Sequence, residues 1–236
     1  MSGSIHPKTI PVVLATGNPD KVKELRPMLE QVSPLFSVQA LSELGITKEI
    51  EETETTLSGN ALLKADAIFA LLEQRFAFFI TMADDTGLEV DALGGEPGVL
   101  SARFAPVAEG RKPSYEDNIR HLLLRMEGME KREARFRTVI AMKGRIPSRG
   151  APFEFRNTAE GVVEGSISEE KKGDLGFGYD PVFHVNSAGK TFAEMTLSEK
   201  NSISHRSLAL RKASAKLFEI MSAHCSPENQ DTPSGL

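Results

Sequence analysis

The sequence predicts a mixed α/β fold, in which helices flank a central β-sheet and two lobes surround a cleft. Short apolar runs alternate with segments of helical periodicity in the first half, which is typical of α/β proteins. The second half holds more strand-like runs than one simple doubly wound sheet needs. Because no repeat or Gly/Ser linker divides the chain, we expect one domain over residues 9–224, with disordered ends at 1–8 and 225–236.

The first elements are a buried strand and a capped helix. The apolar run "TIPVVLATG" (9–17) ends in glycine, which predicts a strand followed by an exit turn. Asn18 is a suitable N-cap and Pro19 suits the first helical position, so a helix is expected over 18–32. Pro27 interrupts this helix and is expected to kink it.

A second strand, a helix and a central strand follow. "FSVQAL" (36–41) predicts the strand, and an acidic, Thr-rich loop comes after it. The helix is expected over 58–74, and "FAFFITMA" (76–83) is too densely apolar for any place but the sheet centre. Residues 88–93 are expected to continue that strand, and 94–98 to form a turn. The inward residues of the helix are expected to be Ala61, Leu62, Ala65, Ile68 and Leu72.

The second half opens with another capped helix and continues with three strands. Ser114 begins a capping box and Gly128 ends the helix that follows it. The runs at 134–143 and 153–165 alternate in polarity, as strands with one buried face do, and 180–185 predicts a third strand.

The last helix is expected to run unbroken over 197–224 with Ser198 as its cap. Lys200, His205 and Arg206 lie near its start, where positive side chains oppose the helix dipole. For Lys200 alone, a solvated basic turn explains the pattern. His205 and Arg206 together indicate an anion or an electron-rich ligand.

Composition limits the class of protein. The formal net charge of −5 does not favour binding to nucleic acid or to an anionic membrane. The single cysteine, Cys225, cannot form an intrachain disulfide, which fits a reducing compartment. No apolar stretch approaches the roughly 20 residues of a membrane span, and "MSGSIHPK" contains no signal core. We therefore expect a cytoplasmic protein.

Asp84 and Asp85 are adjacent where the apolar run stops, and neighbours in a strand can share one solvent exposure only if the strand ends there. One reading is a turn with one solvated and one capping aspartate. The other is a Mg²⁺ site, because this cation combines one or two carboxylates with substrate phosphates. A spare carboxylate could then accept a proton from attacking water. The pair lacks the Asp-x-Asp spacing of aspartyl-phosphate phosphatases.

Two further stretches could hold parts of a site. "TGNPDK" places a glycine turn before a capped helix, so free backbone amides and Lys21 could face an anion. Most such turns only join a strand to a helix, and the spacing is not that of a Walker loop. "EIEETE" is most simply a solvated acidic face, although Glu51 or Glu52 could complete a metal site.

The glycine-rich stretch "GDLGFGYDPVF" contains Phe177 and Tyr179 in a chain without tryptophan. Phe177 could stack on a base, but burial in the core is the commoner fate of an aromatic residue.

Five segments, taken in order, resemble the inosine triphosphate pyrophosphatase family. They are "LATGNPDKVKEL", "GNALLKA", "ADDTGLEVDALGGEPGVLSARF", "GFGYDPVF" and "KTFAEMTLSEKNSISHR". The resemblance implies a homodimer that uses Mg²⁺ to hydrolyse ITP, dITP and XTP between the α and β phosphates. Such an enzyme releases a nucleoside monophosphate and pyrophosphate, which cleanses the nucleotide pool.

The resemblance also implies roles for individual residues. Asp85 would be the catalytic base and a metal ligand, with Asp84, Glu52 and the neighbouring Glu51 as the other metal acids. Thr86 replaces the usual serine and keeps its hydroxyl. The residues matching substrate-binding positions are Thr16, Gly17, Asn18, Pro19, Asp20, Lys21, Lys64, Thr86, Phe177, Gly178, Tyr179, Asp180, Lys200, His205 and Arg206.

The chain departs from the family pattern at two places. Gly59 stands where the family commonly has an acid, and "APVAEGRKPSY" replaces a Gly-rich continuation after Phe104. Three other readings remain open: an enzyme that prunes modified pyrimidine triphosphates, a nucleotide sensor without catalysis, and a phosphatase that removes the γ-phosphate.

Overall fold

The computed structural model describes residues 9–149 and 151–224, so the disorder expected at 1–8 and 225–236 lies outside the described residues. The helices and strands in chain order are β1 (Ile10–Leu14), α1 (Pro19–Val32), β2 (Phe36–Ala40), α2 (Leu57–Leu72), β3 (Phe79–Val90), β4 (Pro97–Gly98), α3 (Tyr115–Arg125), β5 (Glu133–Ile146), β6 (Phe153–Ile167), β7 (Phe183–Val185), β8 (Lys190–Thr191), α4 (Leu197–Ile203) and α5 (His205–His224).

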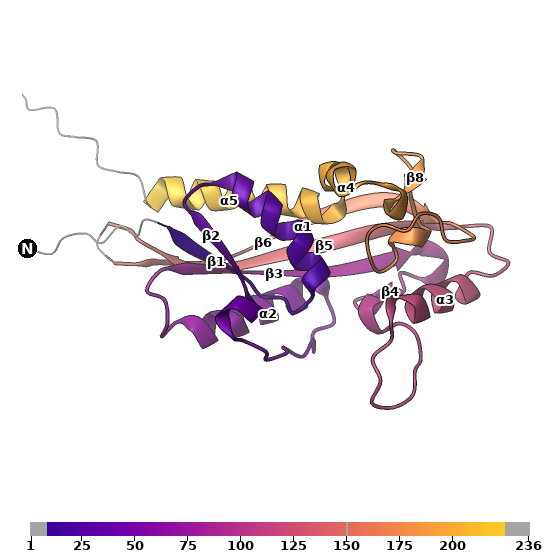
Figure 1. Cartoon of the computed structure of the whole chain (residues 1–236), viewed down its shortest axis with the longest axis horizontal. Helices are drawn as coiled ribbons and strands as arrows, with labels where there is room; N and C mark the ends of the chain where they lie inside the picture. The colour runs from indigo at the N-terminus through magenta and orange to yellow at the C-terminus, as the bar shows by residue number, and fades with distance from the viewer. Residues whose placement is uncertain (1–8, 150, 225–236) are drawn as a thin grey trace, which may run out of the picture.

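One eight-stranded sheet extends along the long axis of the molecule (Figure 1). Its order is β2-β1-β3-β5-β6-β7-β8, with β4 paired to the end of β3. β1 is parallel to both β2 and β3, whereas β5 is antiparallel to its two neighbours, β3 and β6. The predicted mixed α/β class is therefore confirmed, and the three long strands extend through both lobes.

Helices cover the two faces of the sheet at one end and a separate core fills the other end. α1 and α5 lie on one face, where Leu25 and Leu210 pack over Met82. α2 lies on the opposite face, with Ile68 packed near Phe79. α3 lies at the far end of the sheet (Figure 1), where its apolar residues form a third cluster with aromatic residues of β5, β7 and the segment after β8.

The reading of the two aspartates as a strand-end turn is wrong, and the expected continuation of the central strand beyond them is confirmed as far as Val90. β3 continues to Val90, and β5 pairs with it over its whole length, from Phe79 opposite Arg145 to Val90 opposite Ala134. Because side chains alternate along a strand, neighbouring residues of β3 face opposite sides of the sheet.

The prediction of one unbroken helix over 197–224 is wrong. α4 and α5 are separated at Ser204, whose backbone is extended, with φ of −67° and ψ of 154°. Thr196, rather than Ser198, caps α4 by accepting a hydrogen bond from the Glu199 amide. The Ser204 hydroxyl accepts from the Ser207 amide at 3.2 Å and so caps α5. His205 and Arg206 consequently lie in the first turn of a separate helix.

Smaller differences concern local details. Pro27 lies inside α1, which nevertheless continues to Val32. The expected turn at 94–98 contains the short strand β4. Leu62 is only partly buried, unlike its expected partners on α2. None of the helices in the described ranges is both long and apolar enough to cross a bilayer.

Candidate active site

The site begins at the stretch of β3 between the end of β1 and the start of β4, where no strand of the described residues pairs with this edge. The pairing of β1 with β3 reaches Leu14 opposite Met82, and the Ala15 amide then donates to the Met82 carbonyl at 2.8 Å. Two residues further along β3, the carbonyl of Asp84 accepts from Lys64 Nζ at 2.9 Å and from Lys21 Nζ at 3.4 Å. Lysines from helices on opposite faces of the sheet therefore meet at this edge.

The side chain of Asp84 lies on the α1 and α5 side of the sheet. Its Oδ2 atom pairs with Lys21 Nζ at 3.1 Å and with Arg206 Nε at 3.2 Å. Burial alone would raise the pKa of Asp84, but these two cations and Lys64 outweigh it, so the pKa lies well below its usual range. Asp84 is therefore a buried, ionised counter-ion.

The side chain of Asp85 lies on the α2 side and shares Lys64 with Glu52. Lys64 Nζ donates to Asp85 Oδ1 at 2.7 Å and to Glu52 Oε1 at 3.1 Å. Burial raises the pKa of Asp85 by more than the neighbouring lysines lower it. Burial would raise the pKa of Glu52 too, but the interactions with Lys64 and Arg103 outweigh this effect, so the pKa of Glu52 is lowered. Glu51 is exposed, so Glu52 is the acid that the loop brings to the cluster.

These residues fit a divalent cation that substrate completes, rather than a preformed protein cage. Within the described ranges, no three His, Cys, Asp or Glu side chains converge on one point. Glu52 and Asp85 do offer carboxylate oxygens on either side of Lys64. Two carboxylates combined with substrate phosphates form the donor set that Mg²⁺ prefers.

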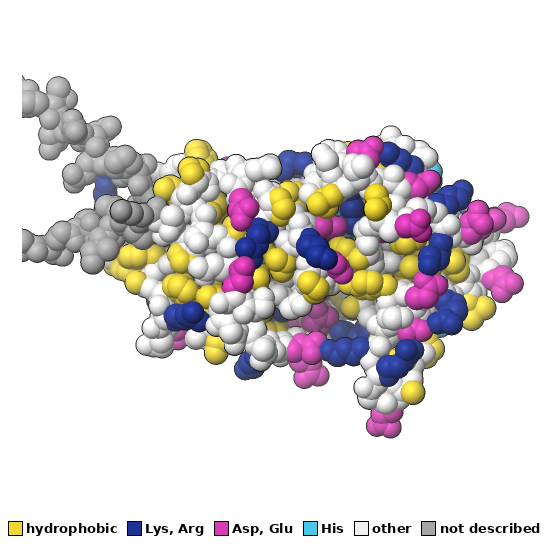
Figure 2. Space-filling view, viewed as in Figure 1, with side chains coloured by type: hydrophobic (Ala, Val, Ile, Leu, Met, Phe, Trp, Pro, Cys, Tyr) yellow, Lys and Arg dark blue, Asp and Glu magenta, His cyan; other side chains and the backbone are white. Residues whose placement is uncertain are grey.

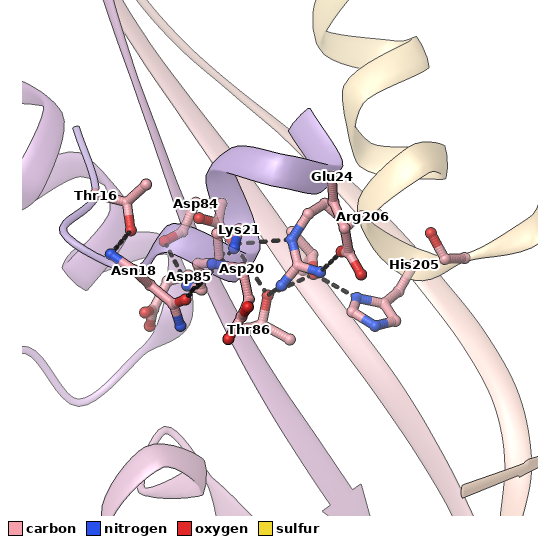
Figure 3. Close-up of polar contacts among 12 residues, drawn as sticks. Thr16, Asn18, Asp20, Lys21, Glu24, Asp84, Asp85, Thr86, His205 and Arg206 are labelled. Carbon is pink, nitrogen blue, oxygen red and sulfur yellow. Dashed lines mark hydrogen bonds and ion pairs between the residues drawn. The ribbon is translucent and has the colours of Figure 1, made fainter. Parts of the chain in front are cut away.

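The turn before α1 differs in one respect from expectation, because most of its amides are already bonded. Asn18 caps α1 as predicted, and its Oδ1 atom accepts from the amides of Asp20 and Lys21 at 2.9 and 3.4 Å. The Asn18 amide donates to the Thr16 hydroxyl at 3.2 Å (Figure 3). The Gly17 amide has no partner among the described residues, and nothing lies within 4 Å of the place a Cβ would take there.

An aromatic and cationic pocket lies on the far side of the cleft. Phe177 is partly exposed, with Lys200 Nζ 5.0 Å and the Arg206 guanidinium carbon 5.4 Å from its ring centroid. Asp180 fixes the turn that carries Phe177, because its Oδ2 atom accepts from the Phe177 amide at 2.8 Å. Gly178 occupies the left-handed region with φ of +63°, and the buried Tyr179 hydroxyl donates to the Ser101 carbonyl at 2.9 Å.

A buried glutamate that the sequence analysis did not identify connects the cations of this pocket. Glu24 of α1 is only 4% exposed; its Oε1 atom accepts from Lys200 Nζ at 2.6 Å, and its other oxygen forms a short ion pair with Arg206. Lys200 also donates to Asp180 at 2.5 Å. The available signal was a charged residue three positions after Lys21 on the inward side of an amphipathic helix.

His205 is buried beside Arg206 and hydrogen-bonded through Nδ1. The Thr138 hydroxyl lies 2.6 Å from Nδ1 and 2.7 Å from the Thr86 hydroxyl. Burial, together with the charges of Arg206 and Lys200, lowers the pKa of His205 well below its usual value. Figure 3 shows His205 and Arg206 at the start of α5, directed toward Thr86 and Asp84.

The two ends of the site share one cleft. Figure 2 shows this side of the molecule indented beside a protruding loop, with acidic and basic side chains around the indentation. The predicted residues that line the cleft are Asn18, Lys21, Glu52, Asp85, Thr86, Phe177, Gly178, Tyr179, Asp180, Lys200, His205 and Arg206. An adjoining hollow is lined by Thr16, Gly17 and Lys64.

Four predicted residues line neither hollow: Pro19, Asp20, Glu51 and Asp84. The cleft in turn contains residues that the sequence did not suggest, among them Tyr115, Ser101 and Phe136. Tyr115 comes from α3, where its hydroxyl accepts from Asn18 Nδ2 at 3.2 Å and donates to Asp20 at 3.3 Å. It thereby joins the two sides of the cleft.

Fold and site together define a two-lobed mixed α/β protein with a deep charged cleft beside the carboxyl end of a parallel strand. The chain belongs to the Ham1 family, whose model matches residues 12–216. This membership confirms the resemblance of the five ordered segments to inosine triphosphate pyrophosphatases.

Named relatives and solved structures agree with this assignment. A Chlorobaculum tepidum protein named dITP/XTP pyrophosphatase is 56% identical over 218 residues, which cover 92% of this chain and 96% of the relative. A Bacillus subtilis protein of the same name is 45% identical over 88% of this chain and 96% of its own. The structure of the Staphylococcus aureus Ham1 protein matches with a TM-score of 0.73 at 36% identity, over 89% of this chain and 99% of that one.

Proposed function

We propose that this protein hydrolyses the non-canonical purine nucleoside triphosphates ITP, dITP and XTP to the nucleoside monophosphate and pyrophosphate, with Mg²⁺. The observation that carries the proposal is a single cleft with lysines and carboxylates at one end and an aromatic, cationic pocket at the other. The first end suits a triphosphate and the second suits a purine. The names of the relatives support the same reaction.

The phosphates need positive charge that the protein as a whole does not provide, since its formal net charge is −5. Lys21, Lys64 and the free amide of Gly17 lie together on the phosphate side of the cleft. Glu52 and Asp85 would hold the cation, leaving Asp84 as the counter-ion of Lys21 and Arg206. When bound, Mg²⁺ neutralises phosphate charge and acts as a Lewis acid.

Asp85 is the base in this scheme. It accepts the proton of a water molecule that attacks the α-phosphorus, and the bond from that phosphorus to the bridging oxygen breaks. The departing pyrophosphate keeps the electron pair, and Lys21 and Lys64 stabilise its charge. A pKa raised by burial suits a general base, because proton transfer is most efficient when the pKa approaches the working pH.

The purine pocket favours a 6-oxo group. Arg206 is a permanent donor held by Glu24 and Asp84, so it can bond the oxygen of hypoxanthine or xanthine. Adenine would present an amino donor to this donor, at a cost of about 1–3 kcal/mol per unsatisfied group. Phe177 would stack on any base and add affinity rather than discrimination.

The decisive experiment is identification of the products from ITP and Mg²⁺. Inosine monophosphate and pyrophosphate are expected. Release of inosine diphosphate and phosphate would identify a γ-phosphatase, and binding without products would identify a sensor. Faster hydrolysis of dUTP than of ITP would favour a pyrimidine-directed enzyme.

We also propose that the enzyme is a cytoplasmic homodimer. Family resemblance supports the dimer, and the single cysteine fits a reducing compartment. Light scattering after size exclusion should give twice the mass of 25.7 kDa, and a monomer would contradict the proposal.

A further inference from the structure

Two threonine hydroxyls connect His205 to Asp84 through three hydrogen bonds. His205 Nδ1 lies 2.6 Å from Thr138 Oγ1, and Thr138 Oγ1 lies 2.7 Å from Thr86 Oγ1. Thr86 in turn donates to Asp84 Oδ2 at 3.3 Å. Thr138, which is fully buried in β5, has no part in the reaction as proposed above.

The direction of these hydrogen bonds follows from one fixed end. Asp84 Oδ2 is paired with Lys21 and Arg206, so this carboxylate oxygen only accepts. A hydroxyl has one proton, and Thr86 uses it toward Asp84 while it accepts from Arg206 Nη2 at 3.3 Å. The Thr138 proton then points to Thr86, and the bond between Thr138 and His205 needs a proton on Nδ1. The reverse order would aim a lone pair of Thr86 at the carboxylate.

We propose that Thr138 is a positioning residue, which holds His205 in the Nδ1–H tautomer so that Nε2 accepts a hydrogen bond from the ring N–H of a 6-oxopurine. The ligand part of this statement rests on the proposed function, whereas the tautomer does not. His205 becomes an acceptor beside the donor Arg206, and the two side chains complement the neighbouring donor and acceptor of hypoxanthine and xanthine.

The surroundings of the imidazole support an accepting Nε2. Phe136 stacks on the ring at 4.6 Å between centroids and Phe192 packs edge-on at 5.8 Å, so the ring plane is fixed. His205 lines the cleft, and its Nε2 atom has no hydrogen-bond partner in the described part of the chain. The lowered pKa keeps the ring neutral, with one nitrogen free to accept.

The consequence is a second point of discrimination against adenine. Hypoxanthine and xanthine carry a hydrogen on N1, whereas N1 of adenine is an acceptor. Adenine would therefore place two lone pairs opposite each other at His205, in addition to the two donors at Arg206. The missing hydrogen bond and the unsatisfied polar groups both weaken the binding of adenine relative to hypoxanthine and xanthine.

Nitrogen NMR of the free protein tests the tautomer without any substrate. The ¹⁵N-histidine-labelled protein is compared with His205→Gln to assign the ring signals of His205. A protonated shift at Nδ1 and an unprotonated shift at Nε2 are expected, and inosine monophosphate should move the Nε2 signal. The opposite pattern of shifts overturns the proposal. So does an Nε2 signal that inosine monophosphate leaves unchanged when it is bound.

Thr138→Val removes the hydroxyl at nearly constant volume, and Thr138→Ser keeps it. The ratio of kcat/KM for ITP to that for ATP should fall roughly three- to tenfold in Thr138→Val, which corresponds to one neutral hydrogen bond, and Thr138→Ser should restore it. Thr158→Val makes the same chemical change on the neighbouring strand β6, outside the cleft, and should leave the ratio unchanged.

Outcomes for the two proposals are separable. A folded Thr138→Val protein with the parental ratio overturns the positioning role. A wild-type protein that releases no pyrophosphate from ITP overturns the proposed function, while the NMR measurement still decides the tautomer.

Discussion

Asp84 and Asp85 are adjacent in the chain but belong to different electrostatic environments. Asp84 faces Lys21 and Arg206, and Asp85 faces Lys64 on the other side of β3. The same strand therefore holds one carboxylate with a lowered pKa and one with a raised pKa. Two identical residues can thus serve as counter-ion and as base, because their surroundings separate their protonation equilibria.

Replacement of Asp85 tests the role of the base. In Asp85→Asn the hydrogen bond to Lys64 can persist through the amide oxygen, so nucleotide binding should remain. Turnover of ITP should fall roughly 100- to 10,000-fold, which is the usual contribution of a general base. Steady-state kinetics and calorimetric titration with inosine monophosphate measure the two effects; parental turnover in this variant contradicts the assignment.

The pH profile offers a second check on the same residue. Activity of the wild type should be lost as the pH falls through the pKa of Asp85, because the protonated acid cannot accept a proton. Burial raises that pKa, so the acid limb of kcat/KM should lie above the ordinary aspartate value of 3.8. An acid limb at or below this value would argue for another base.

Glu24 is the second residue whose replacement is informative. Glu24→Gln leaves Lys200 and Arg206 without one buried negative charge, so we expect a loss of roughly 3 kcal/mol in the free energy of unfolding. KM for ITP should rise because the purine-facing cations are no longer held. Urea titration and initial rates measure both, and Glu30→Gln at an exposed site of the same helix is the control.

The position of α5 relative to β6 decides where His205 and Arg206 stand. Gly161 of β6 passes so close to the first turn of α5 that a Cβ there would lie 2.2 Å from the His205 carbonyl oxygen and 2.4 Å from the Ala209 amide nitrogen. Both contacts are with backbone, which cannot swing away as a flexible side chain would. The absence of a side chain at Gly161 therefore sets the height of the helix above the sheet.

Gly161→Ala should displace the start of α5. Overpacking of this kind costs about 1–3 kcal/mol, so we expect a lower melting temperature together with a reduced preference for ITP over ATP. Scanning calorimetry and paired kinetic assays measure the two effects. Glu164→Ala on the exposed side of the same strand is the control. If Gly161→Ala matches this control in melting temperature and in the preference for ITP, then Gly161 does not set the position of α5.

The sequence predicted those elements whose signals are local. The start of α1 followed from Asn18 and Pro19, because a cap and a first-turn proline act within a few residues. The two-residue strands β4 and β8 were missed, since they are too short to show a period and exist through their partners. The break at Ser204 was missed because the helical pattern continues through it.

The candidate site was predictable to the extent that its motifs resemble a family. Glu24 escaped prediction because its partners Lys200 and Arg206 lie 176 and 182 positions further along the chain. The reading of Asp84 and Asp85 as a strand-end turn failed for a similar reason, since Arg206, which pairs with Asp84, lies 122 positions away. Compensation of a buried charge by distant residues leaves no periodic signal in the sequence.

At the scale of the whole molecule, the buried charges link stability to pH. Asp84 has a lowered pKa in the folded state, so its contribution to stability is fully present above the unfolded value of about 3.8 and is lost as the pH falls through the lower folded value. Asp84→Asn should cost about 3–5 kcal/mol at neutral pH, because Lys21 and Arg206 lose a buried partner.

The cost of Asp84→Asn should shrink on acidification. Urea titrations of the wild type and the variant, at neutral pH and at successively lower pH, measure the difference in the free energy of unfolding. Asp66→Asn removes a partly exposed carboxylate that pairs with Arg156, and it should change stability by no more than about 1 kcal/mol. A difference between Asp84→Asn and the wild type that stays constant with pH would contradict the linkage.

The early end of β1 has a consequence for how this architecture can vary. Had the ladder between β1 and β3 continued for two more residues, an amide would have taken the Asp84 oxygen that both lysines now share. An enzyme with a longer β1–β3 pairing would therefore be less active. Substitutions that lengthen β1 should be selected against, even where they raise the melting temperature.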